Sequence, residues 1–146
     1  MAVKAGVITA VIIGIAVAVL VGRAPKHDMQ PTMVKVGGTT IAVEVADSPA
    51  ERTQGLSGRA SLAEGTGLLF DFKEPGDYAI WMKDMRFAID IVWANEGRVV
   101  TVAHDVSPDT FPQAFRSSAP ARYVLELPAG TAAAHGIAEG GEFVVQ

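Results

Sequence analysis

The sequence predicts an all-β sandwich or barrel with one or two short helices, preceded by an apolar amino-terminal segment. Over residues 32–146, short runs rich in Val, Ile and aromatic residues recur between Gly, Pro, Asn and Asp turn signals, which is typical of strands. Only two brief stretches carry helix signals. A chain with many short strands and few helices favours an all-β architecture.

The amino-terminal segment is apolar on every face. Residues 5–22 contain no charged side chain, and a helix of that length reaches roughly 27 Å, close to the lower limit for crossing a bilayer. The alternative is a cleaved secretory signal, whose apolar region is shorter. We expect an anchor or signal at residues 1–22, a tether at 23–31 and a β domain at 32–146. The domain is then membrane-anchored on the periplasmic side, or secreted if the segment is cleaved.

Charge and motifs exclude several functions. The domain carries 9 Lys and Arg against 15 Asp and Glu, without a basic run, which argues against nucleic acid as a partner. The chain has no Cys, its three His lack metal-ligand spacing, and no phosphate loop or dinucleotide fingerprint is present. We therefore expect no metal and no cofactor.

The first part of the domain predicts a hairpin and a helix. Met33–Val36 and Thr39–Ala46 flank Gly37-Gly38, a hairpin turn signature. Ser48 can cap a helix that has Pro49 at its first position and Glu51 completing a capping box. Gly55 or Gly58 then ends this helix.

Further strands and a second helix follow. A turn at Asn95-Glu96-Gly97 separates two of the strands, and the Pro-bearing residues 105–120 predict an ordered loop over the sheet. The second short helix is expected at Ala129–His135, closed by Gly136. The predicted strands are Gly67–Phe72, Tyr78–Lys83, Ala88–Ala94, Arg98–His104, Arg122–Leu127 and Glu142–Val145.

A lone acid, Asp90, interrupts an apolar run and requires an explanation. If Asp84–Phe87 connects the two flanking runs as a hairpin, Trp81 lies opposite Asp90, and both share one face with Lys83 and Val92. The other face, with Ile80, Met82, Ile89, Ile91 and Trp93, is then core. Asp90 forms the floor of a polar pocket in this interpretation. In the structural alternative, it accepts hydrogen bonds from loop backbone or pairs with Arg52.

Other candidate residues are Arg52 and Glu126. Arg52 could pair with Asp90 or Glu126 as a buried ion pair, or bind a ligand's carboxylate or hydroxyl. Glu126 alternates out of phase with Tyr123, Leu125 and Leu127, so it shares a face with Arg122 and Val124. Asp90 and Glu126 could together act as acid and base. Phe111 and Phe115 are either core residues or a lid over Trp81.

Five segments follow one another in a characteristic order: Glu51–Leu56, Gly67–Phe70, Trp81–Met85, Ile89–Val92 and Tyr123–Gly130, followed by Gly136-Ile137. In these segments the chain resembles a known family, DUF192 (UPF0127). The chain departs from the family pattern at Asp84-Met85, where the family has Asn-Thr, at Ser57 instead of Met, and at Ile89 instead of Leu. The resemblance implies a jelly-roll-like β-sandwich, often exported, without an assigned activity.

We expect a non-catalytic, envelope-tethered domain that binds a small polar or carbohydrate-like ligand, or an envelope protein, at a Trp81/Asp90 face. The candidate ligand-binding residues are Arg52, Trp81, Lys83, Asp90 and Glu126. One alternative is a hydrolase or lyase that uses Asp90 and Glu126. Another is a purely structural accessory subunit.

Overall fold

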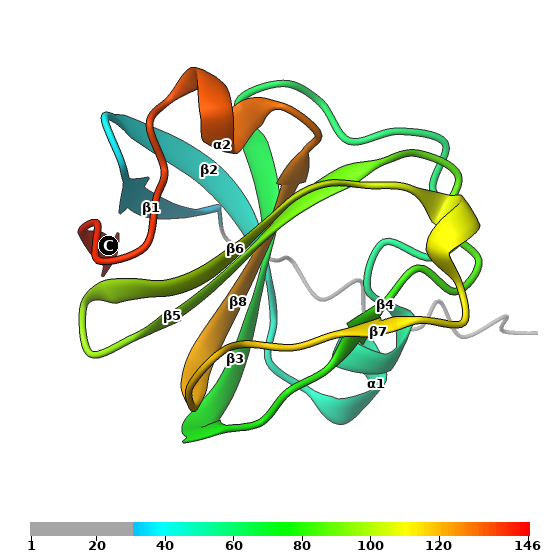
Figure 1. Cartoon of the computed structure of the whole chain (residues 1–146), viewed down its shortest axis with the longest axis horizontal. Helices are drawn as coiled ribbons and strands as arrows, with labels where there is room; N and C mark the ends of the chain where they lie inside the picture. Colours follow the sequence, from blue (N-terminus) through cyan, green and yellow to red (C-terminus); the bar gives the residue numbers. More distant parts are fainter. Residues whose placement is uncertain (1–30) are drawn as a thin grey trace, which may run out of the picture.

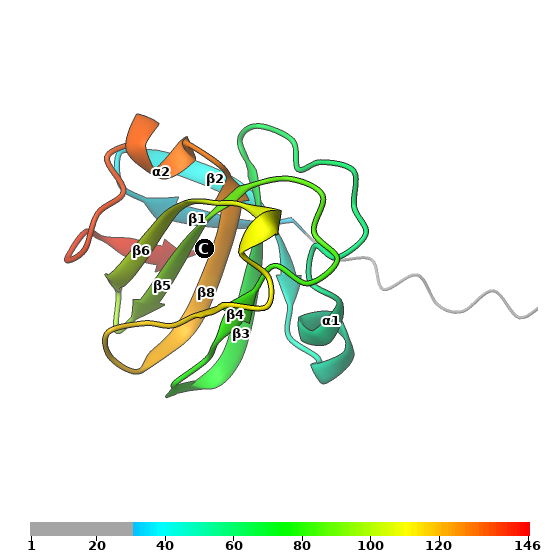
Figure 2. The same cartoon turned by 45° about the vertical axis from the view of Figure 1, so that its right-hand side comes forward.

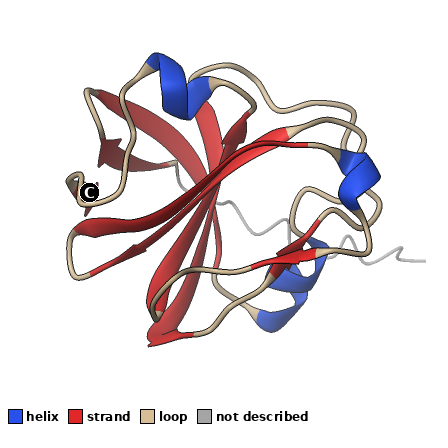
Figure 3. Ribbon diagram, in the orientation of Figure 1, coloured by secondary structure: helices blue, strands red, loops and turns tan. Residues whose placement is uncertain are grey.

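A computed structural model describes residues 31–146, which form a mainly β fold and confirm the predicted predominance of strands (Figures 1 and 3). The predicted anchor or signal at 1–22, and the tether except for Pro31, lie outside the described residues. None of the helices within residues 31–146 has the length and apolar character needed to cross a membrane. The elements are β1 (Thr32–Val36), β2 (Thr39–Ala46), α1 (Pro49–Gln54), β3 (Thr66–Gly76), β4 (Ile80–Trp81), β5 (Ile89–Asn95), β6 (Arg98–Val106), the 3₁₀ turn η1 (Pro108–Thr110), β7 (Ala114–Phe115), β8 (Ala121–Pro128), α2 (Thr131–Ala134) and β9 (Phe143–Val145).

Seven strands form one sheet in the order β6-β5-β8-β3-β2-β1-β9, and β4 and β7 form a separate two-stranded ribbon. The sheet curls until its end strands meet (Figures 1 and 2). Val99 N–H donates to the Gly141 carbonyl and Phe143 N–H to the Gly97 carbonyl, each at 2.9 Å. The sequence predicted either a sandwich or a barrel, and the curled sheet corresponds to a partial barrel.

The pairing of β2 with β3 is parallel, whereas jelly rolls are antiparallel. Parallel neighbours need a long connection that returns the chain to the starting end of the sheet. Here α1 and the loop at residues 55–65 supply that connection. This connection matters for the site, because it lies over the same region of the sheet as β4.

Local turn and cap signals are confirmed. Gly37 has φ +56° in the β1–β2 turn, where a side chain would be strained. Ser48 accepts from Glu51 N–H, and the Glu51 side chain accepts from Ser48 N–H, so the capping box that begins α1 is complete. Gly55 ends the helix with φ +49°. The predicted turn at residues 95–97 joins β5 to β6.

Side chains alternate between two cores on the two faces of the sheet. One core lies inside the curl, because it joins Val99 of β6 to Phe143 of β9 and also holds Val92, Leu125 and Leu127. The second core covers the opposite face. It contains Ile80, Met82, Ile89, Ile91 and Trp93, the set that the sequence predicted to be buried together, along with Leu68, Phe70 and Val124.

The predicted hairpin between Tyr78–Lys83 and Ala88–Ala94 is wrong. β5 pairs with β6 on one edge and β8 on the other, so neither edge is free for the segment that contains Trp81. That segment forms only the short β4, which pairs with β7 through Ile80↔Phe115 and Trp81↔Ala114. The core assignment was correct because burial of apolar residues does not depend on which strands pair.

Candidate functional site

Asp90 is a structural residue enclosed by backbone. Its side chain is 0% exposed, and its two oxygens each accept one backbone hydrogen bond. Oδ1 accepts from Asp105 N–H at 2.8 Å, and Oδ2 accepts from Ala132 N–H at 2.7 Å, in the first turn of α2. The structural alternative of backbone hydrogen bonds is confirmed. Asp90 therefore joins the end of β6 to α2 and offers no surface to a ligand.

The predicted shared face of Asp90 and Trp81 is wrong, and Asp90 and Glu126 lie on opposite faces of the sheet. On β5, Asp90 alternates with Ile89 and Ile91, so it points to the same side as Val92, inside the curl. On β8, Glu126 alternates with Leu125 and Leu127 and shares the outer face with Val124. The sheet separates the two carboxyl groups, which excludes the proposed acid–base pair.

A narrow cleft brings three predicted residues together. The cleft is bounded by α1, by the loop after α1 and by β4. Its volume is about 70 Å³. We call it the Trp81–Glu126 cleft; Arg52, Leu56, Phe70, Ile80, Trp81 and Glu126 are among its lining residues. Trp81 forms the rim, where it is 55% exposed.

A wider groove continues outward from this cleft. It has a volume of about 350 Å³ and shares Thr53, Gln54, Ser57 and Trp81 with the cleft. Lys83 and Asp84 also line this outer groove, so four of the five predicted residues lie in one continuous site, while Asp90 does not. Asp84 has φ +57°, and Ser57 donates its hydroxyl to the Lys83 carbonyl at 2.9 Å. These local contacts connect the loop after α1 to the end of β4.

Phe111 extends the aromatic rim of the site. Its ring lies edge-on to Trp81, with the ring centroids 5.8 Å apart, and it is 44% exposed. Of the two residues considered for a lid over Trp81, Phe111 therefore contacts the Trp81 ring. Phe115 instead packs on the outer core from β7, so it does not belong to the rim.

Glu126 is the most unusual group in the cleft. It is only 5% exposed, and its Oε2 has no hydrogen-bond partner among the described residues. Burial raises the pKa of Glu126 to about 8, against the opposing attraction of the Arg59 guanidinium. The carboxyl group is thus mostly protonated at pH 7. A buried polar group without a partner is costly, and such groups concentrate at functional sites.

Arg52 does not pair with Asp90 or Glu126 as the sequence suggested. Its Nη1 donates to the backbone carbonyls of Asp47 and Asp71, and its guanidinium lies over the Phe72 ring, 5.3 Å from the centroid. These contacts fix α1 against β3. Arg52 therefore forms part of the cleft wall while its charge is satisfied by the backbone.

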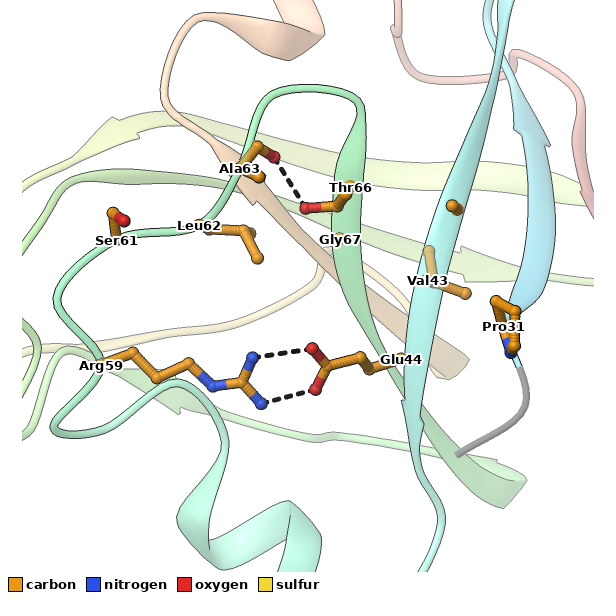
Figure 4. Close-up of a pocket in the computed structure, with 10 residues that line it drawn as sticks. Pro31, Val43, Glu44, Arg59, Ser61, Leu62, Ala63, Thr66 and Gly67 are labelled. Carbon is orange, nitrogen blue, oxygen red and sulfur yellow. Dashed lines mark hydrogen bonds and ion pairs between the residues drawn. The ribbon is translucent and has the colours of Figure 1, made fainter. Parts of the chain in front are cut away.

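Arg59 pairs with Glu44 through two hydrogen bonds of 3.0 and 2.6 Å (Figure 4). This bond lowers the pKa of Glu44. The register pairs Glu44 with Leu68 and Leu68 with Glu126, so the three lie in one row across β2, β3 and β8. The pair lines a second, larger cavity of about 460 Å³, in which the opposite charges satisfy each other.

Sequence reasoning missed several residues of the cleft, among them Gln54, Phe70 and Met85. A signal for them existed. Four of the segments that carry the family resemblance line the site: 51–56 and 81–85 each supply several residues, 67–70 contributes Phe70 and 123–130 contributes Glu126. Within residues 31–146, no group of three His, Cys, Asp or Glu side chains is arranged to hold a metal ion.

Comparison with known proteins identifies two solved structures that are similar to this chain. A protein of Sinorhizobium meliloti 1021, described as a candidate transcription regulator, has 30% identity and a TM-score of 0.75, covering 80% of this chain and 95% of its own. A Novosphingobium aromaticivorans DSM 12444 protein of unknown function has 28% identity and a TM-score of 0.75, covering 83% and 89%. No curated protein matches. The model of DUF192, described as an uncharacterised ACR, matches residues 32–145, and the chain belongs to this family.

Proposed function

We propose that the chain is a non-catalytic binding domain, tethered at the cell envelope, that takes a small polar or sugar-like ligand at the Trp81–Glu126 cleft and outer groove. The observation that carries this proposal is the Oε2 atom of Glu126, which is buried in the cleft without a partner. When a ligand donates a hydrogen bond to a buried carboxyl group that otherwise lacks one, the new bond stabilises the complex.

The rim supports the same proposal. Trp81 and Phe111 expose aromatic surface on which the C–H face of a sugar ring or an aliphatic segment can lie. The wider groove beside Trp81 provides both Lys83 and Asp84 for hydroxyl or charged groups. The cleft thus combines an apolar wall with a few polar groups, which is the usual composition of small-molecule sites.

A non-catalytic role is supported by the arrangement of carboxyl groups. The acid–base alternative required Asp90 beside Glu126, and Asp90 is held by backbone on the other face of the sheet. The envelope tether rests on the sequence of residues 5–22 alone. Protease accessibility of the domain in spheroplasts tests it: we expect digestion from outside the cell, and complete protection would contradict the proposed location.

The description of the S. meliloti relative as a candidate transcription regulator does not lead us to propose nucleic-acid binding. The described residues carry 9 basic against 15 acidic side chains. Five of the basic residues form ion pairs with neighbouring carboxylates, which lowers their availability for phosphates. These residues are Lys35, Arg59, Lys73, Arg116 and Arg122.

A thermal-shift screen of the full chain in mild detergent tests the binding function. The library contains neutral sugars, amino sugars, amino acids and polyamines. We expect at least one class to raise the Tm of the wild type, and Trp81→Ala to remove that shift while folding normally. Val144→Ala, which changes an exposed apolar residue on β9, should retain it. A library without hits, or hits that Trp81→Ala retains, would contradict binding at this cleft.

A further inference from the structure

The group that enters the cleft must satisfy a carboxyl group that has apolar neighbours on both adjacent strands. Glu126 pairs with Leu68 on β3 and with Ile91 on β5, and both neighbours are buried. Neither strand therefore offers a side-chain hydrogen bond at this position. The partner for Oε2 has to come from the side of the cleft.

Two guanidinium groups face this region, and neither forms a hydrogen bond with Glu126. Arg59, on the loop after α1, is held by both oxygens of Glu44 on β2 and acts on Glu126 only through its charge. Arg52, on α1, donates to two backbone carbonyls and lies over Phe72. Farther out, Lys83 and Asp84 line the outer groove. Glu126 thus lacks a direct counter-ion, although two cations are present.

The size and walls of the cleft restrict what can enter. A volume of about 70 Å³ holds a head group of a few atoms and excludes a whole sugar ring or a bulky guanidinium. Phe70 and Trp81 present aromatic rings in its lining, and aromatic faces attract cations, more so where water is excluded. The described residues also carry an excess of acidic side chains, which favours the approach of a cation.

We propose that the group bound in the Trp81–Glu126 cleft is a primary ammonium, which donates a hydrogen bond to Oε2 of Glu126, while the remainder of the ligand lies along Trp81 in the outer groove. An amino sugar, a polyamine and a lysine side chain share this chemistry. The inference rests on the proposed binding function and specifies the ligand class for that site.

Binding of an ammonium ion has a defined proton balance. The free carboxyl group holds a proton at pH 7, because burial raises the pKa of Glu126 to about 8. When the ammonium enters, Glu126 ionises, its proton passes to the solvent and a carboxylate–ammonium pair forms. As the pH increases toward about 8, the affinity should therefore increase close to tenfold per pH unit. Above pH 8 the affinity should level off, until the ligand amine itself loses its proton near pH ~10.

A matched pair of probes tests the inference on the full chain. Butylammonium and 1-butanol have the same carbon chain and differ in the charged head group. We would follow the Trp81 indole N–H by NMR at pH 6, 7 and 8, and measure heats of binding in two buffers of different ionisation enthalpy. We expect butylammonium to bind about tenfold more tightly at pH 7 than at pH 6, with release of close to one proton, and 1-butanol to bind at least tenfold more weakly at pH 8.

Variants separate this inference from the binding function. Glu126→Gln should abolish proton release and the pH dependence, and Trp81→Ala, which alters only an exposed side chain, should weaken binding without changing the proton count. Equal affinity for both probes, or binding without proton release, would overturn the ammonium inference. The binding function would still stand if neutral ligands bound the wild type and not Trp81→Ala. It would fail together with the inference if no ligand bound, or if Trp81→Ala bound every ligand as the wild type does.

Discussion

Asp90 and Glu126 are both buried carboxyl groups, yet their environments give them opposite roles. Asp90 accepts one backbone N–H hydrogen bond on each oxygen, so the fold provides a donor for both of its side-chain oxygens. Glu126 has an oxygen without a partner, and burial keeps it protonated. A satisfied carboxylate contributes to the fold, whereas an unsatisfied one lowers stability and is retained where it serves a ligand.

The first prediction concerns Glu126 and pH. The pKa of Glu126 rises from 4.5 in the unfolded chain to about 8 in the folded protein. Below pH 4.5 the group is protonated in both states, so its ionisation does not reduce the free energy of unfolding. Stability is then lost as the pH rises from about 4.5 to 8, at no more than about 1.4 kcal/mol per pH unit. Glu126→Gln should remove this loss and be more stable than the wild type at pH 8, by a few kcal/mol at most. Urea unfolding at pH 5 and 8 measures it; an identical pH slope in both proteins would contradict the account.

The second prediction concerns Asp90. Asp90→Asn replaces one of two acceptor oxygens by an N–H donor that faces a backbone N–H, which leaves buried groups unsatisfied. We expect a loss of about 2–3 kcal/mol in the free energy of unfolding, without an effect on ligand affinity in the folded fraction. Asp109→Asn, at an exposed position, serves as the control. A fully stable Asp90→Asn variant with lost binding would restore Asp90 as a ligand residue.

The sequence showed that Asp90 needed hydrogen-bond donors but could not identify them. One donor, Ala132 N–H, lies 42 residues away along the chain. No local pattern contains that information, because it depends on where α2 packs against β5. The alternation of residues on β8, in contrast, predicted the face of Glu126 correctly.

At the scale of elements, local signals were reliable and strand partners were not. The β1–β2 hairpin and the start of α1 follow from a few adjacent residues, and both form as predicted. The choice of β6 and β8 as neighbours of β5 is a long-range competition between apolar strands. The sequence interpretation selected the nearest segment, Tyr78–Lys83, and therefore placed Trp81 beside Asp90.

A third prediction concerns α1, which forms one wall of the cleft. Ser48→Ala removes the side chain that accepts from Glu51 N–H, and we expect a cost of about 1 kcal/mol in unfolding free energy. Because α1 has only six residues, loosening its first turn should also weaken ligand binding at the cleft. Ser61→Ala, an exposed serine outside α1, is the matched control in urea unfolding and ligand titration. Equal stability of the two variants would show that the cap does not position this wall.

At the scale of the whole molecule, the curled sheet has a strong middle and a weaker seam. The strands β5, β8 and β3 pair on both edges and carry both cores. The seam between β6 and β9 consists of a few backbone hydrogen bonds near Gly140 and Gly141. The sequence could predict many strands but not this closure, since it depends on the accumulated twist of seven strands.

The fourth prediction follows from this difference. In native-state hydrogen exchange, the amides of Val99 and Phe143 at the seam should exchange at least tenfold faster than those of Val92 and Leu125 in the central strands. Mass spectrometry or NMR can measure both sets in one experiment. Equal protection of the two sets would indicate that the curl opens only when the whole domain unfolds.

The proposed function requires that Glu126 is an unpaired, protonated carboxyl group that a ligand engages in the Trp81–Glu126 cleft. The side-chain carboxyl ¹³C shift of Glu126, titrated between pH 4 and 10 with and without butylammonium, tests it most directly. We predict a midpoint near pH 8 in the free protein and a lower midpoint with the ligand bound. A midpoint near 4.5 in the free protein, or one that butylammonium leaves unchanged, would contradict the claim.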